Sequence, residues 1–204
     1  MGMGRKGKGP SHAKREDMQG VVHVNVKLLE GLPSLRRGKE YRVLEGCFRK
    51  GKERFGCKLI HFGVMSNHVH FIVIVKNTAE LSRFMQGLKV RIAKGLNRLW
   101  GRKGTVFVER FFARAASGWK QMRRLFHYVM NNARKHGIPV PKGQPDRFSS
   151  ARWYEAIMGE VRRPLRSPPV VPMIEYTCVW STYDGFIPPR LDLDHVPGTY
   201  FPFV

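Results

Sequence analysis

Residues 57–75 contain two apolar runs of strand length that are separated by only two residues. The first run is CKLIHFGVM, the second is HVHFIVIV, and the intervening Ser66 and Asn67 suit a tight turn. Both runs are rich in β-branched and aromatic residues, which favour strands. The pattern predicts a β-hairpin at the centre of a sheet, so the rest of the chain has to cover that sheet.

The segments around the hairpin alternate between strand and helix patterns. Residues 79–101 show apolar side chains at helical spacing, with Thr78 as the expected N-cap and Gly101 beyond the end. Strict alternation at 20–29 is typical of a half-buried strand. The predicted order is a strand at 20–29, a helix at 34–56, the hairpin at 57–75, a helix at 79–101, a strand at 104–116 and a helix at 117–137.

This order predicts an α+β fold, a ferredoxin-like split βαβ sandwich with an antiparallel central sheet and one extra helix after it. A length of 204 residues suits one principal domain, which we assign to 19–150. Residues 1–18 are rich in Gly, Lys and Arg and predict a flexible basic arm. Eleven of the 13 prolines follow residue 138, so 151–204 is expected to be a proline-rich extension of turns and extended chain.

The charge balance points to a polyanionic partner. Lys and Arg total 37 against 15 Asp and Glu, a formal net charge of +22, and this excess favours nucleic acid over an anionic membrane surface. The three cysteines are widely spaced and suggest no disulfide framework. No apolar stretch reaches the length of a membrane span. We therefore expect a cytoplasmic, nucleoid-associated protein.

His68 and His70 stand at the start of the second apolar run. Residues two apart on a strand share a face, so both imidazoles would lie side by side and could hold one divalent metal. Ile72 and Ile74 continue the same face, which predicts that this face of the sheet is covered. Taken alone, such a pair is more often two polar residues that begin a strand.

A second pair of polar residues lies in the segment HYVMNNARKHG. Tyr128 and Asn132 are four residues apart on the predicted last helix and are therefore neighbours on one face. Both fall at the edge of the apolar stripe, so we expect side chains that reach over the sheet without being fully buried. A tyrosine at such an edge usually keeps its hydroxyl in water.

Together, MSNHVHFIVIV and YVMNNARKHG resemble the two motifs of the single-tyrosine HUH transposases, most closely those of the REP-associated tyrosine transposase branch. The likeness covers roughly residues 20–150. Proline is usual in the family where Ser66 stands, and it commonly follows the asparagine where Ala133 stands. These departures affect the rigidity of a turn and the end of a helix, and they remove no functional group.

The resemblance implies a role for each of four residues. His68 and His70 match the metal-binding pair, Tyr128 matches the nucleophile, and Asn132 matches the position that supplies an amide oxygen as third ligand. The implied reaction is cleavage and strand transfer of single-stranded or hairpin DNA through a 5′-phosphotyrosine, with Mg²⁺ or Mn²⁺ as the metal. Such a reaction conserves bond energy, and the sequence contains no P-loop motif.

Basic residues are concentrated in the middle of the chain. Residues 76–124 hold 13 Lys and Arg against two acids, interleaved with Phe and Trp, which suits contact with phosphates and unpaired bases. Arg110 and Arg114 share one face of the predicted strand and are the preferred contacts. The candidate DNA-binding residues are Arg110, Arg114, Arg134, Lys135, Lys89 and Arg91.

Several alternatives stay open at this point. A relaxase or replication initiator shares the histidine pair and the tyrosine, although such proteins usually need a larger chain. A domesticated nucleic-acid-binding protein with little turnover is compatible with the charge. Cys57 and His61 could join the histidine pair in a zinc site. A nuclease with an acidic triad is disfavoured because acids are scarce in the domain, and the choice between a monomer and a homodimer is open.

Overall fold

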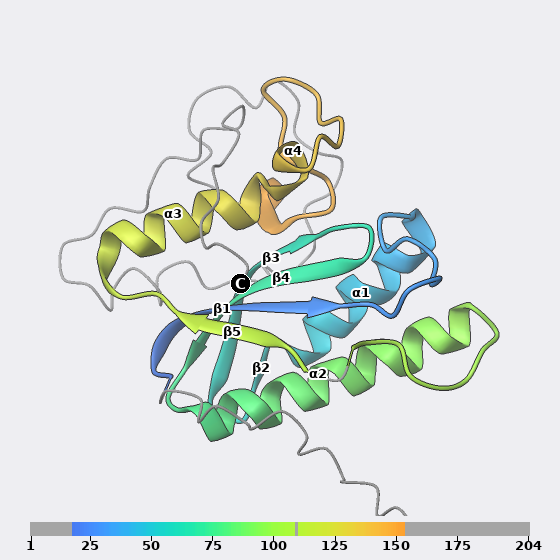
Figure 1. The fold of residues 1–204 in the computed structure, drawn as a ribbon, viewed down its shortest axis with the longest axis horizontal. Helices are drawn as coiled ribbons and strands as arrows, with labels where there is room; N and C mark the ends of the chain where they lie inside the picture. The colour runs from blue at the N-terminus through green and yellow to red at the C-terminus, as the bar shows by residue number, and fades with distance from the viewer. Residues whose placement is uncertain (1–17, 109, 154–204) are drawn as a thin grey trace, which may run out of the picture.

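The structure is a computed structural model that describes residues 18–108 and 110–153. The predicted arm at 1–18 lies outside the described residues except for Met18, and the predicted extension at 151–204 lies outside them except for its first three residues. Figure 1 shows the described part as one sheet with helices on both sides.

The sheet has five strands and is antiparallel throughout. The strands are β1 (Gly20–Lys27), β2 (Glu53–Arg54), β3 (Cys57–Val64), β4 (His68–Val75) and β5 (Phe112–Ala115). Their order across the sheet is β2-β3-β4-β1-β5. Because β4 is antiparallel to both of its neighbours, β1 and β3 run parallel on either side of it. This is the split βαβ arrangement, so the predicted fold class is confirmed.

Helices cover both faces of this sheet (Figure 1). The helices are α1 (Gly38–Gly51), α2 (Thr78–Leu99), α3 (Gly118–Met130), the short α4 (Asn132–Lys135) and a final 3₁₀ turn at Ser150–Trp153. The first two pack together on one face, and α3 crosses the other face over β3 and β4. Within the described residues, no helix combines the length and apolar character needed to cross a lipid bilayer.

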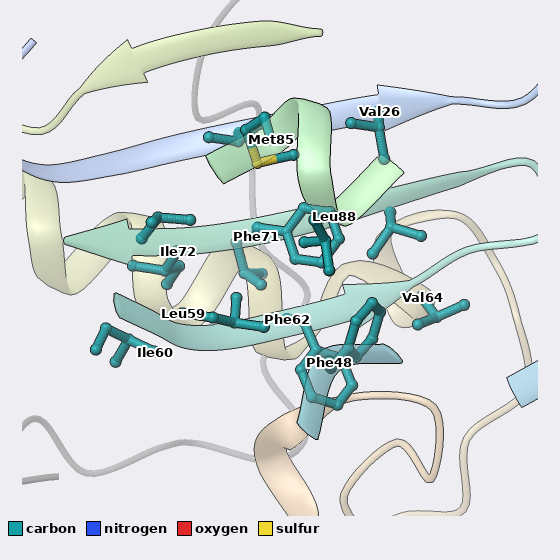
Figure 2. Packing of buried hydrophobic residues seen from close by; sticks show 14 of the residues in the cluster. Val26, Phe48, Leu59, Ile60, Phe62, Val64, Phe71, Ile72, Met85 and Leu88 are labelled. Atoms are coloured by element: carbon teal, nitrogen blue, oxygen red, sulfur yellow. The ribbon is translucent and has the colours of Figure 1, made fainter. Parts of the chain in front are cut away.

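The main core lies between the sheet and the α1–α2 layer. Alternate residues of β4 point into it, and Phe71 meets Phe48 of α1 edge to face, with ring centroids 5.3 Å apart. Phe62 of β3 packs against the same Phe48 ring at 4.7 Å, and Figure 2 shows Leu88 of α2 beside this group. Such ring pairs each add about 1 kcal/mol beyond the apolar area they bury. The packing fixes which face of β4 is left for α3.

The other face of β4 presents His68 and His70 toward α3, as the alternation predicts. β3 approaches α3 so closely here that a Cβ atom at Gly63 would lie 2.5 Å from the carbonyl oxygen of Val129. Gly63 is paired with His70 across the strands. A glycine at this position therefore lets the α3 backbone rest directly beside the strand that carries the histidines.

Several predicted boundaries of helices and strands are wrong. Asn77, and not Thr78, is the N-cap of α2, since its side chain accepts a 2.9 Å hydrogen bond from the backbone N–H of Glu80. The strand expected at 104–116 pairs with β1 only over Phe112–Ala115. The two-residue strand β2 is not foreseen by the sequence pattern because both of its residues are polar and exposed.

The last predicted helix, at 117–137, is interrupted. α3 ends at Met130, Asn131 has φ −104° and ψ 16°, and α4 begins at Asn132. Asparagine side chains compete for backbone hydrogen bonds and make adjacent asparagines a weak point in a helix. The expectation of one continuous helix through Tyr128 and Asn132 is therefore wrong, although the two residues remain close.

The chain after α4 returns along β3. The backbone N–H of Val64 donates to Phe148 at 2.9 Å, and Gly63 and Ser149 form an isolated bridge. Arg36 donates to both carboxylate oxygens of Asp146 at 2.8 Å, and both side chains are nearly buried. A bidentate pair of this kind holds two distant segments together. This ion pair anchors the segment after α4 to the turn that precedes α1.

Candidate active site

Four histidines meet on the face of the sheet that α3 covers. His68 and His70 come from β4, His23 comes from β1, and His136 follows α4. The ring centroid of His70 lies 4.7 Å from that of His68 and 5.1 Å from that of His23, and the His136 ring lies 5.6 Å from His68. Only the first two were predicted as site residues.

The predicted histidine pair converges on one point. The Nε2 atoms of His68 and His70 are 3.0 Å apart. The Nδ1 atom of His68 lies 2.8 Å from the Oδ1 atom of Asn67. An amide oxygen only accepts hydrogen bonds, so His68 carries its proton on Nδ1 and presents a lone pair at Nε2. The sequence predicts Asn67 only as a turn residue, whereas in the structure its side chain also sets which nitrogen of His68 carries the proton.

His23 is the residue that the sequence pattern did not reveal. It is 2 % exposed, and its Nε2 atom lies 2.9 Å from the Nδ1 atom of His70. The alternation at 20–29 assigned it to the less apolar face of a half-buried strand, which is the correct face, but here this face is covered. A single histidine inside a run of valines was the one available signal.

Burial keeps these imidazoles neutral. It lowers the pKa of His68 to about 4, with smaller contributions from His136 and Lys27. It also lowers the pKa of His23 to about 3, and the pKa of His70 lies well below the ordinary value for the same reason. Neutral rings have the free lone pair that a metal ion requires.

Tyr128 packs directly over this cluster. Its ring lies 5.4 Å from the ring of His70 and 5.9 Å from that of His23, and the Nζ atom of Lys135 lies 4.6 Å from the Tyr128 centroid. Burial raises the pKa of the Tyr128 hydroxyl, whereas the neighbouring Asn132 side chain acts to lower it. The structure therefore brings the two predicted motifs into one site.

Tyr128 and Asn132 are more buried than predicted. Tyr128 is 3 % exposed and Asn132 is fully buried. The helical periodicity placed both at an open edge, and that inference is wrong because the sheet beneath α3 covers this edge as well. No hydrogen bond of standard geometry is formed by the Oδ1 or Nδ2 atom of Asn132 among the described residues, but the side chain lies beside the Tyr128 hydroxyl, whose pKa it acts to lower. A buried amide oxygen is a suitable ligand for a hard cation.

The ligand set fits a hard divalent metal. The 3.0 Å between the two Nε2 atoms matches the separation of adjacent ligands on an octahedral ion with bonds of about 2.1 Å. No group of three or more His, Cys, Asp or Glu side chains in the described part of the chain is arranged to bind a metal. The zinc alternative with Cys57 and His61 is therefore not formed, and His68, His70 and Asn132 remain the candidates.

Two of the candidate DNA-binding residues lie near this cluster. Arg114 stands opposite His23 in the β1–β5 register, on the exposed edge strand, and Phe112 beside it is 46 % exposed. Lys135 contacts the Tyr128 ring, as described above. Arg110 is also exposed but precedes β5, so the predicted strand does not extend to it.

The other candidates are placed differently. Arg134 donates hydrogen bonds to the backbone oxygens of Pro141 and Gln144, which ties its guanidinium group to the following loop. Lys89 and Arg91 lie on α2, across the sheet from the histidines. Lys89 donates to a backbone oxygen at 3.1 Å. These three side chains are not brought to the histidine cluster.

Comparison with known proteins agrees with this geometry. The sequence profile described as "Transposase IS200 like" matches residues 34–132. A structure of a REP-associated tyrosine transposase bound to a REP hairpin aligns with a TM-score of 0.57 and 22 % identity, over 70 % of this chain and 84 % of that one. No curated protein shows a significant match.

A second solved structure gives a weaker likeness. It is named as a transposase of Deinococcus radiodurans R1 and aligns with a TM-score of 0.41 and 15 % identity, over 57 % of this chain and 90 % of that one, too low to indicate a common fold. The profile match spans the histidine pair, Tyr128 and Asn132. The segment that contains these residues therefore resembles the IS200-like transposases in sequence, and the domain shares its fold with the REP-associated tyrosine transposase.

Proposed function

We propose that this enzyme cleaves and rejoins single-stranded or hairpin DNA with Tyr128 as the nucleophile. The observation that carries the proposal is the contact of the Tyr128 ring with His70, whose Nε2 atom faces that of His68. Oη of Tyr128 would attack the scissile phosphorus and the bond to the 3′ oxygen would break. The tyrosine loses its hydroxyl proton and the departing oxygen gains one, which leaves a 5′-phosphotyrosine and a free 3′-hydroxyl.

The chain's own residues supply the ligands for this chemistry. His68, His70 and Asn132 would hold Mg²⁺ or Mn²⁺, since their mixed nitrogen and oxygen donors suit such ions. A divalent metal supplies positive charge that polarises the phosphate and stabilises the transition state. Because burial raises the pKa of Tyr128, loss of its proton needs assistance from its surroundings. The ammonium group of Lys135, whose Nζ atom lies 4.6 Å from the Tyr128 ring centroid, places a positive charge beside the tyrosine.

We further propose that DNA reaches the site over β5. Arg114 and the half-exposed Phe112 lie one strand from His23, and a basic and an aromatic side chain together suit an unpaired nucleotide. Arg110 is also exposed and precedes β5 in the chain. The hairpin in the related solved structure supports a DNA partner with local secondary structure. Such a partner would place the protein on the nucleoid.

The direct test is covalent capture. The full chain, incubated with Mn²⁺ and labelled hairpin-forming single strands, should yield an adduct that survives denaturing electrophoresis. Tyr128→Phe should abolish the adduct, because the variant lacks the attacking oxygen. Tyr41→Phe is the matched control, since it removes another buried phenolic hydroxyl, on α1, and should leave the adduct unchanged.

Two results would contradict the proposal. An adduct of undiminished yield in Tyr128→Phe would assign the nucleophile to another residue. Salt-sensitive DNA binding by the unaltered chain with no adduct on any single strand would instead favour a domesticated DNA-binding protein. His68→Ala should abolish cleavage and retain DNA binding, which separates loss of chemistry from loss of the partner.

A further inference from the structure

The histidines form a continuous chain of hydrogen bonds whose direction is set at one end. Asn67 Oδ1 accepts from His68 Nδ1, so the Nε2 atom of His68 has the lone pair. His70 must then donate its Nε2 proton across the 3.0 Å contact to His68. The Nδ1 atom of His70 is consequently the acceptor, and His23 donates to it from Nε2 at 2.9 Å.

Metal binding would reverse the last hydrogen bond of this chain. A metal ligated by the Nε2 atom of His70 occupies the lone pair there, and a neutral imidazole then carries its proton on Nδ1. That proton faces the Nε2 atom of His23, which has to accept it. The side chain at position 23 must therefore donate a hydrogen bond to His70 in the metal-free state and accept one from His70, at the same atom position, in the metal-bound state.

Imidazole is one of the few side chains that meets both requirements. A carboxylate only accepts hydrogen bonds and an ammonium group only donates them. A histidine changes between donor and acceptor at Nε2 by moving its proton to Nδ1. His23 and His70 are 2 % and 0 % exposed, and the His23 side chain is in direct contact with His70 Nδ1 at 2.9 Å, so it is placed to supply both hydrogen bonds.

We propose that His23 is a positioning residue of the metal site, which donates to His70 in the metal-free protein and accepts from it when the metal is bound. The inference rests on the proposed function in taking His70 as a ligand. The number of protons on the two imidazoles is unchanged, because one proton is released to solvent and one is taken up. The Nε2 proton of His23 passes to Nδ1 of His70, the Nε2 proton of His70 is lost to solvent, and one proton is taken up at Nδ1 of His23.

Metal affinity provides the first test and does not depend on catalysis. Mn²⁺ binding to the full chain can be measured through the loss of the electron paramagnetic resonance signal of the free ion. The affinity for Mn²⁺ should be about 10- to 100-fold lower in His23→Phe than in the unaltered chain. His23→Gln should stay within a few-fold of the unaltered chain, because a carboxamide can turn either its oxygen or its N–H₂ toward His70. His61→Phe is the control, since it replaces another fully buried histidine of the same sheet and should leave the affinity unchanged.

Nitrogen NMR of the ¹⁵N-histidine-labelled, unaltered chain is the second test and needs no folded variant. The metal-free protein should show His70 and His23 protonated at Nε2, and saturating Mg²⁺ should move both protons to Nδ1. Two results would overturn the role of His23. One is a His70 that is already protonated at Nδ1 without metal, and the other is a His23→Phe variant that binds Mn²⁺ as tightly as the unaltered chain. The Tyr128 proposal would survive either result, whereas failure of the unaltered chain to bind Mn²⁺ would overturn the metal site in both proposals.

Discussion

Lys135 places a positive charge against the face of the tyrosine that we propose as the nucleophile. Its Nζ atom lies 4.6 Å from the Tyr128 ring centroid, and burial lowers the pKa of this lysine. A cation at this distance favours the phenolate over the phenol as the hydroxyl proton leaves. The sequence had suggested only a phosphate contact for Lys135, so the structure gives the side chain a more specific task.

Replacing Lys135 by Met should slow formation of the covalent adduct roughly tenfold, which corresponds to about 1.4 kcal/mol of lost transition-state stabilisation. Lys135→Arg should keep most of the rate, because the charge stays near the ring. Single-turnover rates at saturating DNA are the appropriate measurement. Lys142→Met removes an exposed lysine from the following loop and serves as control. A Met variant as fast as the unaltered chain would show that the ammonium group has no part in the step.

The proximity of the candidate residues could be predicted where it depends on short spacing along the chain. His68 and His70 share a strand face because they are two residues apart, and Tyr128 and Asn132 are neighbours because they are four apart. The partner of His23 is 47 residues away, and the contact exists only because β1 lies next to β4 in the sheet. No local pattern encodes that adjacency, so the third histidine was missed.

At the level of elements, the contact between β3 and α3 sets the separation of the proposed nucleophile from the proposed ligands on β4. Gly63 pairs with His70 on one side and meets the carbonyl of Val129 on the other. Val129 directly follows Tyr128. A methyl group at position 63 would stand 2.5 Å from that carbonyl oxygen, so α3 would have to move away from the sheet.

Gly63→Ala should therefore lower the cleavage rate, because it displaces Tyr128, and it should weaken metal binding less than His68→Ala does, because the two histidines on β4 stay in place while only Asn132 shifts with α3. Such overpacking also typically costs about 1–3 kcal/mol of stability, measurable by urea unfolding. Gly46→Ala on α1 is the matched control, since a Cβ atom there meets nothing within 4 Å. Equal cleavage rates in the Gly63 variant and the unaltered chain would show that the close approach has no catalytic consequence.

Long, strongly patterned elements could be predicted from the sequence, and their ends could not. The hairpin of β3 and β4 was foreseen because its apolar runs are continuous, and α2 because its stripe spans six turns. No proline or glycine lies beside Asn131 from which the break in the helix could have been predicted. The break results from the local preferences of two asparagines within a packed site, where tertiary contacts decide the backbone.

For the molecule as a whole, the buried histidines make stability depend on pH. Burial lowers the pKa of His23 and His61 to about 3 and that of His68 to about 4, and it also holds the pKa of His70 well below the usual 6.5. As the pH falls below about 6.5, the histidines of the unfolded chain become protonated, whereas the buried histidines of the folded chain stay neutral. Stability is therefore full above this value and is lost progressively toward pH 3–4.

Urea unfolding of the metal-free chain at constant ionic strength should show a free energy of unfolding that falls between pH 6.5 and 4.5. Each buried histidine contributes up to about 1.4 kcal/mol per pH unit in this window. His61→Gln should reduce the slope, because His61 is fully buried and lies outside the metal site. His136→Gln, at an exposed position, should change it less. A free energy that is constant from pH 7 to 5 would contradict this account.

The central place of β1 has a consequence for how the protein is made. Of the strands in the described residues, β1 is the first to be synthesised, yet its partners are β4, which begins at His68, and β5, which begins at Phe112. Both of its edges thus stay unpaired through much of synthesis, and strand pairings so distant along the chain form slowly. Asn132 is added later still. Under the proposed function, competence to cut DNA would therefore arise only after nearly the whole domain has been translated, when β1 has both of its neighbouring strands.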